Sequence, residues 1–172
     1  DKNMRVQGDG LLSNNHLKAT LTYSNLPLEC FEPFLGDITL FGNISGHLDL
    51  SGKKSDPQLA LTVATSALSL WNPNKCKAPP LTASCEATLA NGILHVSSEV
   101  EGLSLKTPTI FELTVPVEIN NSTIRFSDAQ KLSGHLLAEF DSNTILSSYL
   151  DEDELMEGLI QIDARVAGIA SD

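Results

Sequence analysis

Polar and apolar residues alternate over most of the chain. In residues 42–63, GNISGHLDLSGKKSDPQLALTV, apolar positions follow polar ones and a glycine interrupts every few residues. The same alternation recurs in residues 16–23, 110–119 and 158–168. Successive side chains of a β-strand point to opposite faces, so each segment would present one apolar and one polar face. The pattern predicts an all-β protein with roughly ten strands.

Turn-forming dipeptides separate these segments. Asparagine, glycine and proline favour turns because they tolerate or impose unusual backbone angles. An Asn-Gly pair between two alternating runs is the strongest of these signals, and it predicts a two-residue hairpin loop at Asn91-Gly92. The dipeptides that predict turns are Asn14-Asn15, Asp56-Pro57, Pro79-Pro80, Asn91-Gly92 and Asn120-Asn121.

Two segments interrupt the alternation. Residues 26–36, LPLECFEPFLG, carry two prolines among bulky apolar residues and predict a short helix or a packed turn. Residues 143–158, NTILSSYLDEDELMEG, space their apolar residues as a helix does and predict one or two helical turns. We expect the acidic run at 151–154 to be a solvated face or a helix start.

Short motifs recur along the chain. The sequence SGHL occurs at Ser45–Leu48 and again at Ser133–Leu136. The spacing from Gly52 to Asp56 recurs from Gly168 to Asp172. Imperfect repeats of strand, glycine and turn predict an elongated sheet that is extended by repetition.

The composition narrows the range of partners. The chain has 172 residues and a formal net charge of -11, which argues against a nucleic acid and against simple adsorption to an anionic membrane surface. Hydrophobic residues make up 41% and aromatic residues only 5%, so the buried side chains should be mainly aliphatic. No uncharged apolar run reaches the ~18 residues of a membrane span. We expect both ends of the chain to be cut points within a longer protein.

The sequence contains no recognisable catalytic constellation. The four histidines, His16, His47, His95 and His135, lack a cysteine or carboxylate at metal-ligand spacing, so we expect solvent-facing strand residues and no metal. Residues 46–53, GHLDLSGK, fail the glycine spacing of a phosphate-binding loop. There is no nucleophile elbow, zinc-protease motif or dinucleotide fingerprint. We therefore expect no enzymatic activity and no cofactor.

One block of the chain resembles the repeat of the TamB family, AsmA-like proteins that form the inner-membrane component of the translocation and assembly module in diderm bacteria. It carries Leu-Pro-Leu at 26–28, Pro-Phe-Leu at 33–35, the pattern L-x-G-x-[LI]-S-G-x-L-x-L-x-G at 40–52, and then Pro57 after four intervening residues. Two later segments, LSGHLLAEFD and EGLIQIDARVAG, resemble further repeats. The loop from Trp71 to Pro80 and the cysteines depart from the family pattern.

The resemblance implies a long, right-handedly twisted sheet folded lengthwise into a trough, called a β-taco, with an apolar concave face and a hydrophilic convex face. We therefore expect residues 1–172 to be a single β-taco fragment of a periplasmic protein that is anchored in the inner membrane and reaches toward the outer membrane. The implied partners are phospholipid acyl chains, an outer-membrane assembly-factor barrel protein of the TamA-like or BamA-like type, and nascent outer-membrane proteins.

Three functions are compatible with the alternation. The chain is a conduit that shields phospholipid acyl chains between the membranes, a chaperone that captures strands of outer-membrane proteins by β-augmentation, or a purely structural β-sandwich. Alternation does not separate them, because an open trough and a closed sandwich both bury one face of each strand. The apolar positions expected to line the groove are Leu17, Leu21, Tyr23, Leu48, Leu50, Leu59, Leu61, Val63, Leu89, Leu94, Val96, Phe111, Leu113, Val115, Val117, Ile124, Phe126, Leu136, Phe140, Ile160, Ile162 and Val166.

The three cysteines, Cys30, Cys76 and Cys85, lack the paired spacing of a zinc site. They are either small, semi-buried hydrophobic residues or include a Cys76–Cys85 disulfide, which would stabilise the fold by about 3 kcal/mol through loop closure.

We predict that Cys76 and Cys85 pair in an oxidising compartment while Cys30 stays free. Thiol counting on the denatured, unreduced protein should then find one free thiol per chain. Three free thiols would contradict the bridge.

Overall fold

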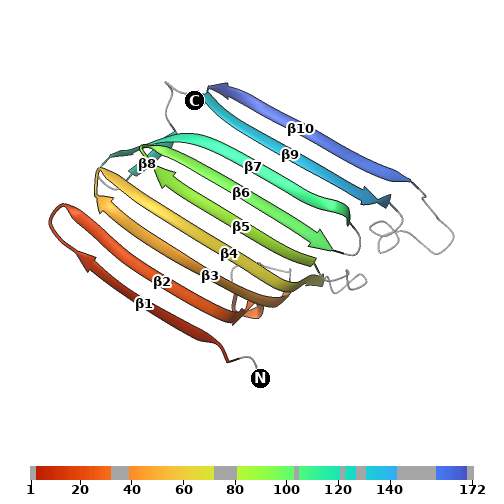
Figure 1. The fold of residues 1–172 in the computed structure, drawn as a ribbon, viewed down its shortest axis with the longest axis horizontal. Helices are drawn as coiled ribbons and strands as arrows, with labels where there is room; N and C mark the ends of the chain where they lie inside the picture. The colour runs from red at the N-terminus through yellow and green to blue at the C-terminus, as the bar shows by residue number, and fades with distance from the viewer. Residues whose placement is uncertain are drawn as a thin grey trace.

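The computed structural model describes residues 3–31, 39–71, 81–102, 105–120, 123–126, 131–142 and 158–169. These residues form ten strands and one short 3-10 helix, η1 (Leu28–Phe31) (Figure 1). The strands are β1 (Arg5–Leu12), β2 (His16–Pro27), β3 (Thr39–Lys53), β4 (Asp56–Trp71), β5 (Leu81–Ala90), β6 (Ile93–Gly102), β7 (Leu105–Asn120), β8 (Thr123–Phe126), β9 (Lys131–Asp141) and β10 (Leu159–Ile169).

All ten strands belong to one antiparallel sheet. Nine of them follow the order β1-β2-β3-β4-β5-β6-β7-β9-β10, and β8 pairs with the C-terminal end of β7. Strands that follow each other along the chain are neighbours in the sheet, except where β8 intervenes. The predicted all-β twisted sheet is confirmed. Within the described ranges no second sheet packs against it, so the sandwich alternative does not describe this architecture.

The hairpin predicted at Asn91-Gly92 is confirmed. Both residues have positive φ, 52° and 70°, as a type I′ turn requires, and they join β5 to β6. The turn predicted at Asn14-Asn15 joins β1 to β2. Residues 79–80 and 121 lie outside the described part of the chain.

The turn predicted at Asp56-Pro57 is wrong. These two residues begin β4, and the turn lies just before them at Lys54 and Ser55. Proline is tolerated near the start of a strand, where one missing amide hydrogen interrupts the ladder least. Gly52, the partner of Pro57 in the β3–β4 register, has a φ of +101° and absorbs the local irregularity.

The short helix or packed turn predicted in residues 26–36 is present as η1, whose Leu28 is only 6% exposed. The helical turns predicted in residues 143–158 fall on residues 143–157, which lie outside the described part. None of the described helical residues forms a segment long and apolar enough to cross a membrane.

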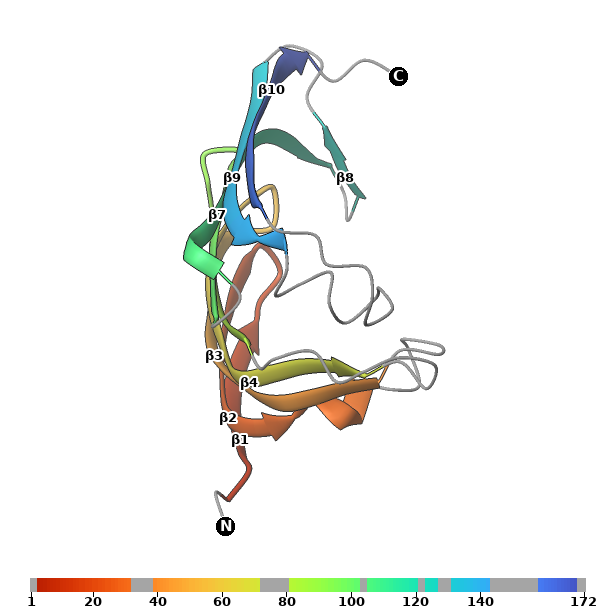
Figure 2. The same cartoon turned by 90° about the vertical axis from the view of Figure 1, so that its right-hand side faces the viewer.

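A line of backbone irregularities crosses β2, β3 and β4. Asn25, Gly42 and Ala67 have φ values of 52°, 127° and 54°, and the strand registers shift at these points. Such bulges bend a strand and increase its twist. Beyond this line the ends of β3 and β4 turn to one side of the sheet, and β8 lies on that same side (Figure 2). The sheet is therefore a trough rather than a flat layer.

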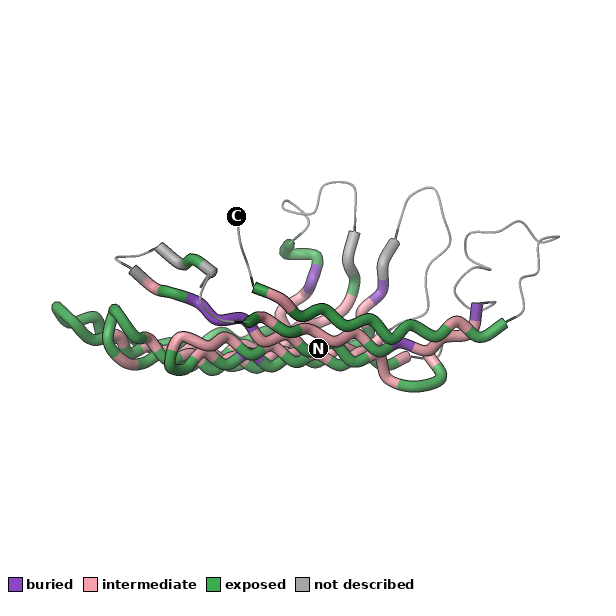
Figure 3. The backbone as a smooth tube through the Cα atoms, turned by 90° about the horizontal axis from the view of Figure 1, so that it is seen from above, coloured by how far each residue is buried: buried purple, intermediate pink, exposed green. Residues whose placement is uncertain are grey.

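Burial is shallow throughout the sheet. Most of the backbone in Figure 3 is exposed or intermediate, and buried residues occur at a few points only. The buried hydrophobic residues are Leu28, Ala87, Val115, Val117 and Ala138. Among the described residues no large side chain is fully buried, which is the expected result for one layer without a covering layer.

Glycines within the strands make room for large neighbours. A Cβ atom on Gly46 would lie 2.5 Å from both the Tyr23 hydroxyl and the Thr62 carbonyl oxygen. A Cβ atom on Gly134 would lie 3.0 Å from a Val166 methyl group. The side chains of adjacent strands therefore fill the space above Gly46 and Gly134, as aromatic residues do above glycines in designed sheets.

We predict that Gly46→Ala destabilises the protein by about 1–3 kcal/mol, because the new methyl group overlaps a ring and a backbone oxygen. Gly168→Ala is the matched control, since nothing lies within 4 Å of its Cβ position, and it should change stability by less than about 0.5 kcal/mol. Urea unfolding of both variants measures the difference. Equal stabilities would contradict the packing of Tyr23 over Gly46.

Candidate functional site: an apolar sheet face

The candidate site is one face of the sheet, which we call the apolar face. Residues directly opposite each other in antiparallel strands have their side chains on the same side, so the register shows which residues share a face. Its central row crosses nine strands from β1 to β10 without a polar residue. The central row consists of Gly8, Leu21, Leu48, Leu61, Ala87, Val96, Leu113, Gly134 and Val166.

Two further rows run beside the central row on the same face. The first flanking row consists of Gly10, Ala19, Leu50, Leu59, Leu89, Leu94 and Val115. The second flanking row consists of Val6, Tyr23, Gly46, Val63, Cys85, Ser98, Phe111, Leu136 and Ala164. Ser98 and Tyr23 contribute the hydroxyl groups, and burial raises the pKa of the Tyr23 phenol.

Most of the predicted groove residues lie in these three rows. Leu17, Val117, Phe140, Ile160 and Ile162 continue the same face on β2, β7, β9 and β10. Ile124 and Phe126 of β8 pair through their backbones with Ile119 and Val117 of β7. The side chains of Ile124 and Phe126 are not among the described parts of the structure. Cys85 lies in the second flanking row and Cys76 outside the described residues, so the disulfide remains a prediction.

Two groups of residues on the apolar face were not among the predicted groove residues: those of β1 and the small alanines. The strand β1 was not predicted, although Val6 and Leu12 alternate there with polar residues while Gly8 and Gly10 occupy apolar positions. Small alanines complete the rows, among them Ala87 on β5. The available signal was the period of two in β1, and the two glycines weakened it.

The apolar face is less exposed than the opposite one. In β5, and in β6 from Leu94 onward, burial alternates, with apolar-face positions intermediate or buried and polar-face positions exposed. Side chains converge on the concave side of a curved sheet and spread apart on the convex side, so we infer that the apolar face lines the trough seen in Figure 2. Exposure increases at the β10 edge, where Val166 is 57% exposed.

The opposite, polar face carries histidines in hydrogen bonds. His47 bonds with Thr22 and Asp49, each at 2.8 Å, and His135 Nε2 lies 2.9 Å from an oxygen of Asp163. This hydrogen bond from His135 lowers the pKa of Asp163, and the nearby Arg165 contributes in the same direction. His47, His95 and His135 all lie on the polar face, as the alternation predicts.

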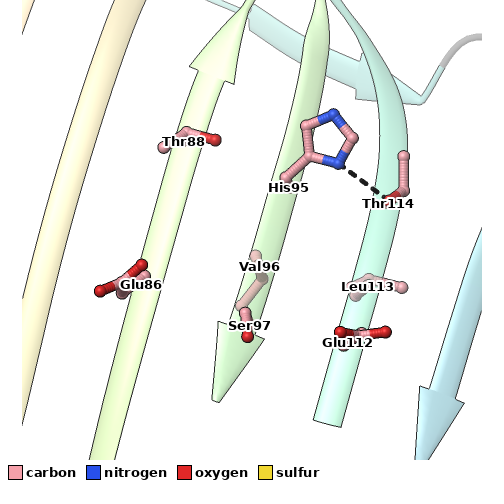
Figure 4. Close-up of a pocket in the computed structure, with 8 residues that line it drawn as sticks. All are labelled: Glu86, Thr88, His95, Val96, Ser97, Glu112, Leu113 and Thr114. Atoms are coloured by element: carbon pink, nitrogen blue, oxygen red, sulfur yellow. Dashed lines mark hydrogen bonds between the residues drawn. The ribbon is translucent and has the colours of Figure 1, made fainter.

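A shallow hollow spans β5, β6 and β7 (Figure 4). On the polar face, Glu86 and Glu112 flank Ser97, and His95 Nδ1 bonds with the Thr114 hydroxyl at 2.9 Å. Within the described ranges, no three or more histidine, cysteine, aspartate or glutamate side chains lie close enough together to hold a metal ion. The hollow therefore offers a solvated acidic surface.

Comparisons with protein-family models, with curated proteins and with solved structures find no match for this chain.

Proposed function

We propose that this chain is a segment of a hydrophobic conduit that shields phospholipid acyl chains during transport between the inner and outer membranes. The observation that supports the proposal most directly is the central row, which crosses nine strands with only apolar side chains and glycine. An apolar surface of that length needs a nonpolar occupant to remove it from water.

The length of the row suits an acyl chain. Nine strands spaced by about 4.8 Å extend over roughly 38 Å. The hydrocarbon core of a whole bilayer is about 30 Å thick, so the chains of one leaflet reach about half that distance. Each methylene group removed from water contributes about 0.8 kcal/mol, and this requires no catalytic residue.

The chemistry of the face also suits a mobile occupant. Its walls are mainly Leu, Val and Ala, which remove surface from water without directional bonds. The charged groups lie on the other face, where Glu86, Glu112 and Asp163 contact solvent. A lipid tail in the trough would therefore meet no buried charge as it moves.

The cellular setting belongs to the same proposal and comes from the TamB resemblance. The chain would act in the periplasm within an inner-membrane-anchored protein, with an outer-membrane assembly-factor barrel protein as its partner. The second candidate function is capture of strands from outer-membrane proteins. It is favoured by the edge strands β1 and β10, each of which has one neighbour within the described part of the sheet.

We predict that Val96→Arg and Leu113→Arg leave the protein folded but abolish binding of a phospholipid with a fluorescent acyl chain. In a water-accessible trough the charged head extends into the lumen, so each change should cost about 1–3 kcal/mol at most. Thermal melts and the fluorescence titration measure the two effects separately.

Ser97→Arg is the matched control, because Ser97 follows Val96 in β6 but lies on the polar face between Glu86 and Glu112. This variant should bind the lipid as the native chain does. Folded Val96→Arg and Leu113→Arg variants with native lipid binding would contradict the conduit. An absence of lipid binding by the native chain, with capture of an unfolded outer-membrane protein instead, would favour the chaperone.

A further inference from the structure

Polar side-chain atoms are distributed unevenly over the apolar face. We call one side of the central row the hairpin side, because it faces the turns that join β1 to β2, β3 to β4 and β5 to β6. On this side, no described strand residue of the apolar face carries a side-chain oxygen or nitrogen. These residues include Gly10, Leu12, Leu17, Ala19, Leu50, Gly52, Pro57, Leu59, Leu89, Leu94, Val115, Val117, Leu132 and Gly168.

The other side of the central row carries hydroxyl groups. We call it the bulge side, because it faces the line of irregularities that crosses β2, β3 and β4. Tyr23 and Ser98 lie in the second flanking row, and Thr65 and Thr109 lie in the row beyond it. We call these four residues the hydroxyl strip. It forms a polar border along one side of an otherwise apolar surface.

Two residues of the hydroxyl strip have no hydrogen-bond partner within the described part of the chain. Thr65 Oγ1 accepts a hydrogen bond from the Ala83 amide at 3.0 Å and donates one to the Ala83 carbonyl at 3.3 Å. The Ser98 and Thr109 hydroxyl groups form no such bond with a described residue, and both residues are half-buried. A molecule that covers the face removes water from these two groups, so it binds best when it supplies an acceptor at this border.

A phospholipid carries acceptors at the corresponding place. Its ester carbonyl oxygens lie where the acyl chains join the glycerol, directly beside the hydrocarbon. Along β7, the six residues from Phe111 in the second flanking row to Val117 span about 20 Å. The acyl chains of one leaflet extend over about 15 Å. Chains that begin at the hydroxyl strip and run toward the hairpin side would therefore contact apolar residues over their whole length.

We propose that the hydroxyl strip binds the ester carbonyl groups of a phospholipid and orients the lipid across the trough. Ser98 and Thr109 donate hydrogen bonds to the ester oxygens, and the acyl chains lie on the hairpin side. The headgroup points away from the hairpin side, and the lipid moves along the central row from strand to strand. This inference rests on the proposed conduit, because it concerns the occupant of the same face.

Quenching by brominated phospholipids tests the orientation. Trp71, the single tryptophan, is first replaced by phenylalanine. A new tryptophan then replaces Leu94 on the hairpin side or Val100 on the bulge side of β6, about 20 Å apart. The protein is loaded from phosphatidylcholine vesicles and separated from them by flotation. Leu89→Trp, directly opposite Leu94, replaces Leu94→Trp if that variant does not fold.

The position of the bromine decides which tryptophan loses its fluorescence. Bromine near the methyl end of the acyl chains should quench Leu94→Trp more strongly than Val100→Trp. Bromine near the ester group should reverse this order. Quenching of Val100→Trp by the methyl end and of Leu94→Trp by the ester end would overturn the orientation, and so would equal quenching of the two variants.

Ether-linked phospholipids test the hydrogen bonds, because they carry the same chains but lack the ester carbonyl groups. The native chain should bind ester-linked phosphatidylcholine about threefold to tenfold more tightly than the ether-linked form. The variant Ser98→Ala/Thr109→Val should bind the two forms equally. Ser97→Ala on the polar face is the matched control and should keep the native preference. Circular dichroism verifies that each variant is folded.

The outcomes separate this inference from the conduit. Equal affinity of the native chain for the two phospholipids would overturn the role of the hydroxyl strip and leave the conduit intact. The same holds for a folded Ser98→Ala/Thr109→Val variant that keeps the native preference. A native chain that binds neither phospholipid would contradict the conduit itself, and this inference with it.

Discussion

Each strand of this sheet must keep its register with both neighbours, because a slip of one residue turns all of its side chains to the other face. The apolar face exists only while nine strands hold this register together. Short loops fix it locally, as the turn at Asn91-Gly92 does for β5 and β6. The irregularities at Asn25, Gly42 and Ala67 occur side by side, so the registers of β2, β3 and β4 shift together where the sheet bends.

A single layer cannot bury much apolar surface by itself. Its stability comes mainly from backbone hydrogen bonds and from side-chain pairs across strands, which contribute about 0.2–1 kcal/mol each. The buried residues Val115 and Val117 of β7 lie where the strand leaves β6 and begins to pair with β8. Most apolar side chains elsewhere in the described part of the sheet are half-buried or exposed. A nonpolar molecule bound in the trough would therefore also stabilise the fold.

The sequence predicts the fold class and the face, because both follow from a period of two that tertiary contacts do not change. Leu113 and Val96 could be assigned to one face from the alternation alone, and the register confirms this. The order of the strands, the separate pairing of β8 and the bend of the sheet could not be predicted from the sequence pattern. They depend on long-range pairing and on positive φ at residues such as Ala67, whose side chain gives no signal of it. The turn at Lys54 was missed because Asp-Pro resembles a turn wherever it occurs.

The repeated SGHL motif acquires a structural meaning in this register. Gly46 and Gly134 both lie on the apolar face, where a neighbouring Tyr23 or Val166 side chain covers them. His47 and His135 follow on the polar face, and each bonds with an aspartate. The motif thus specifies how a strand packs between two neighbours rather than how it binds a ligand. A sheet built this way can be lengthened strand by strand, and a conduit function would depend on the continuity of its rows and not on any single residue.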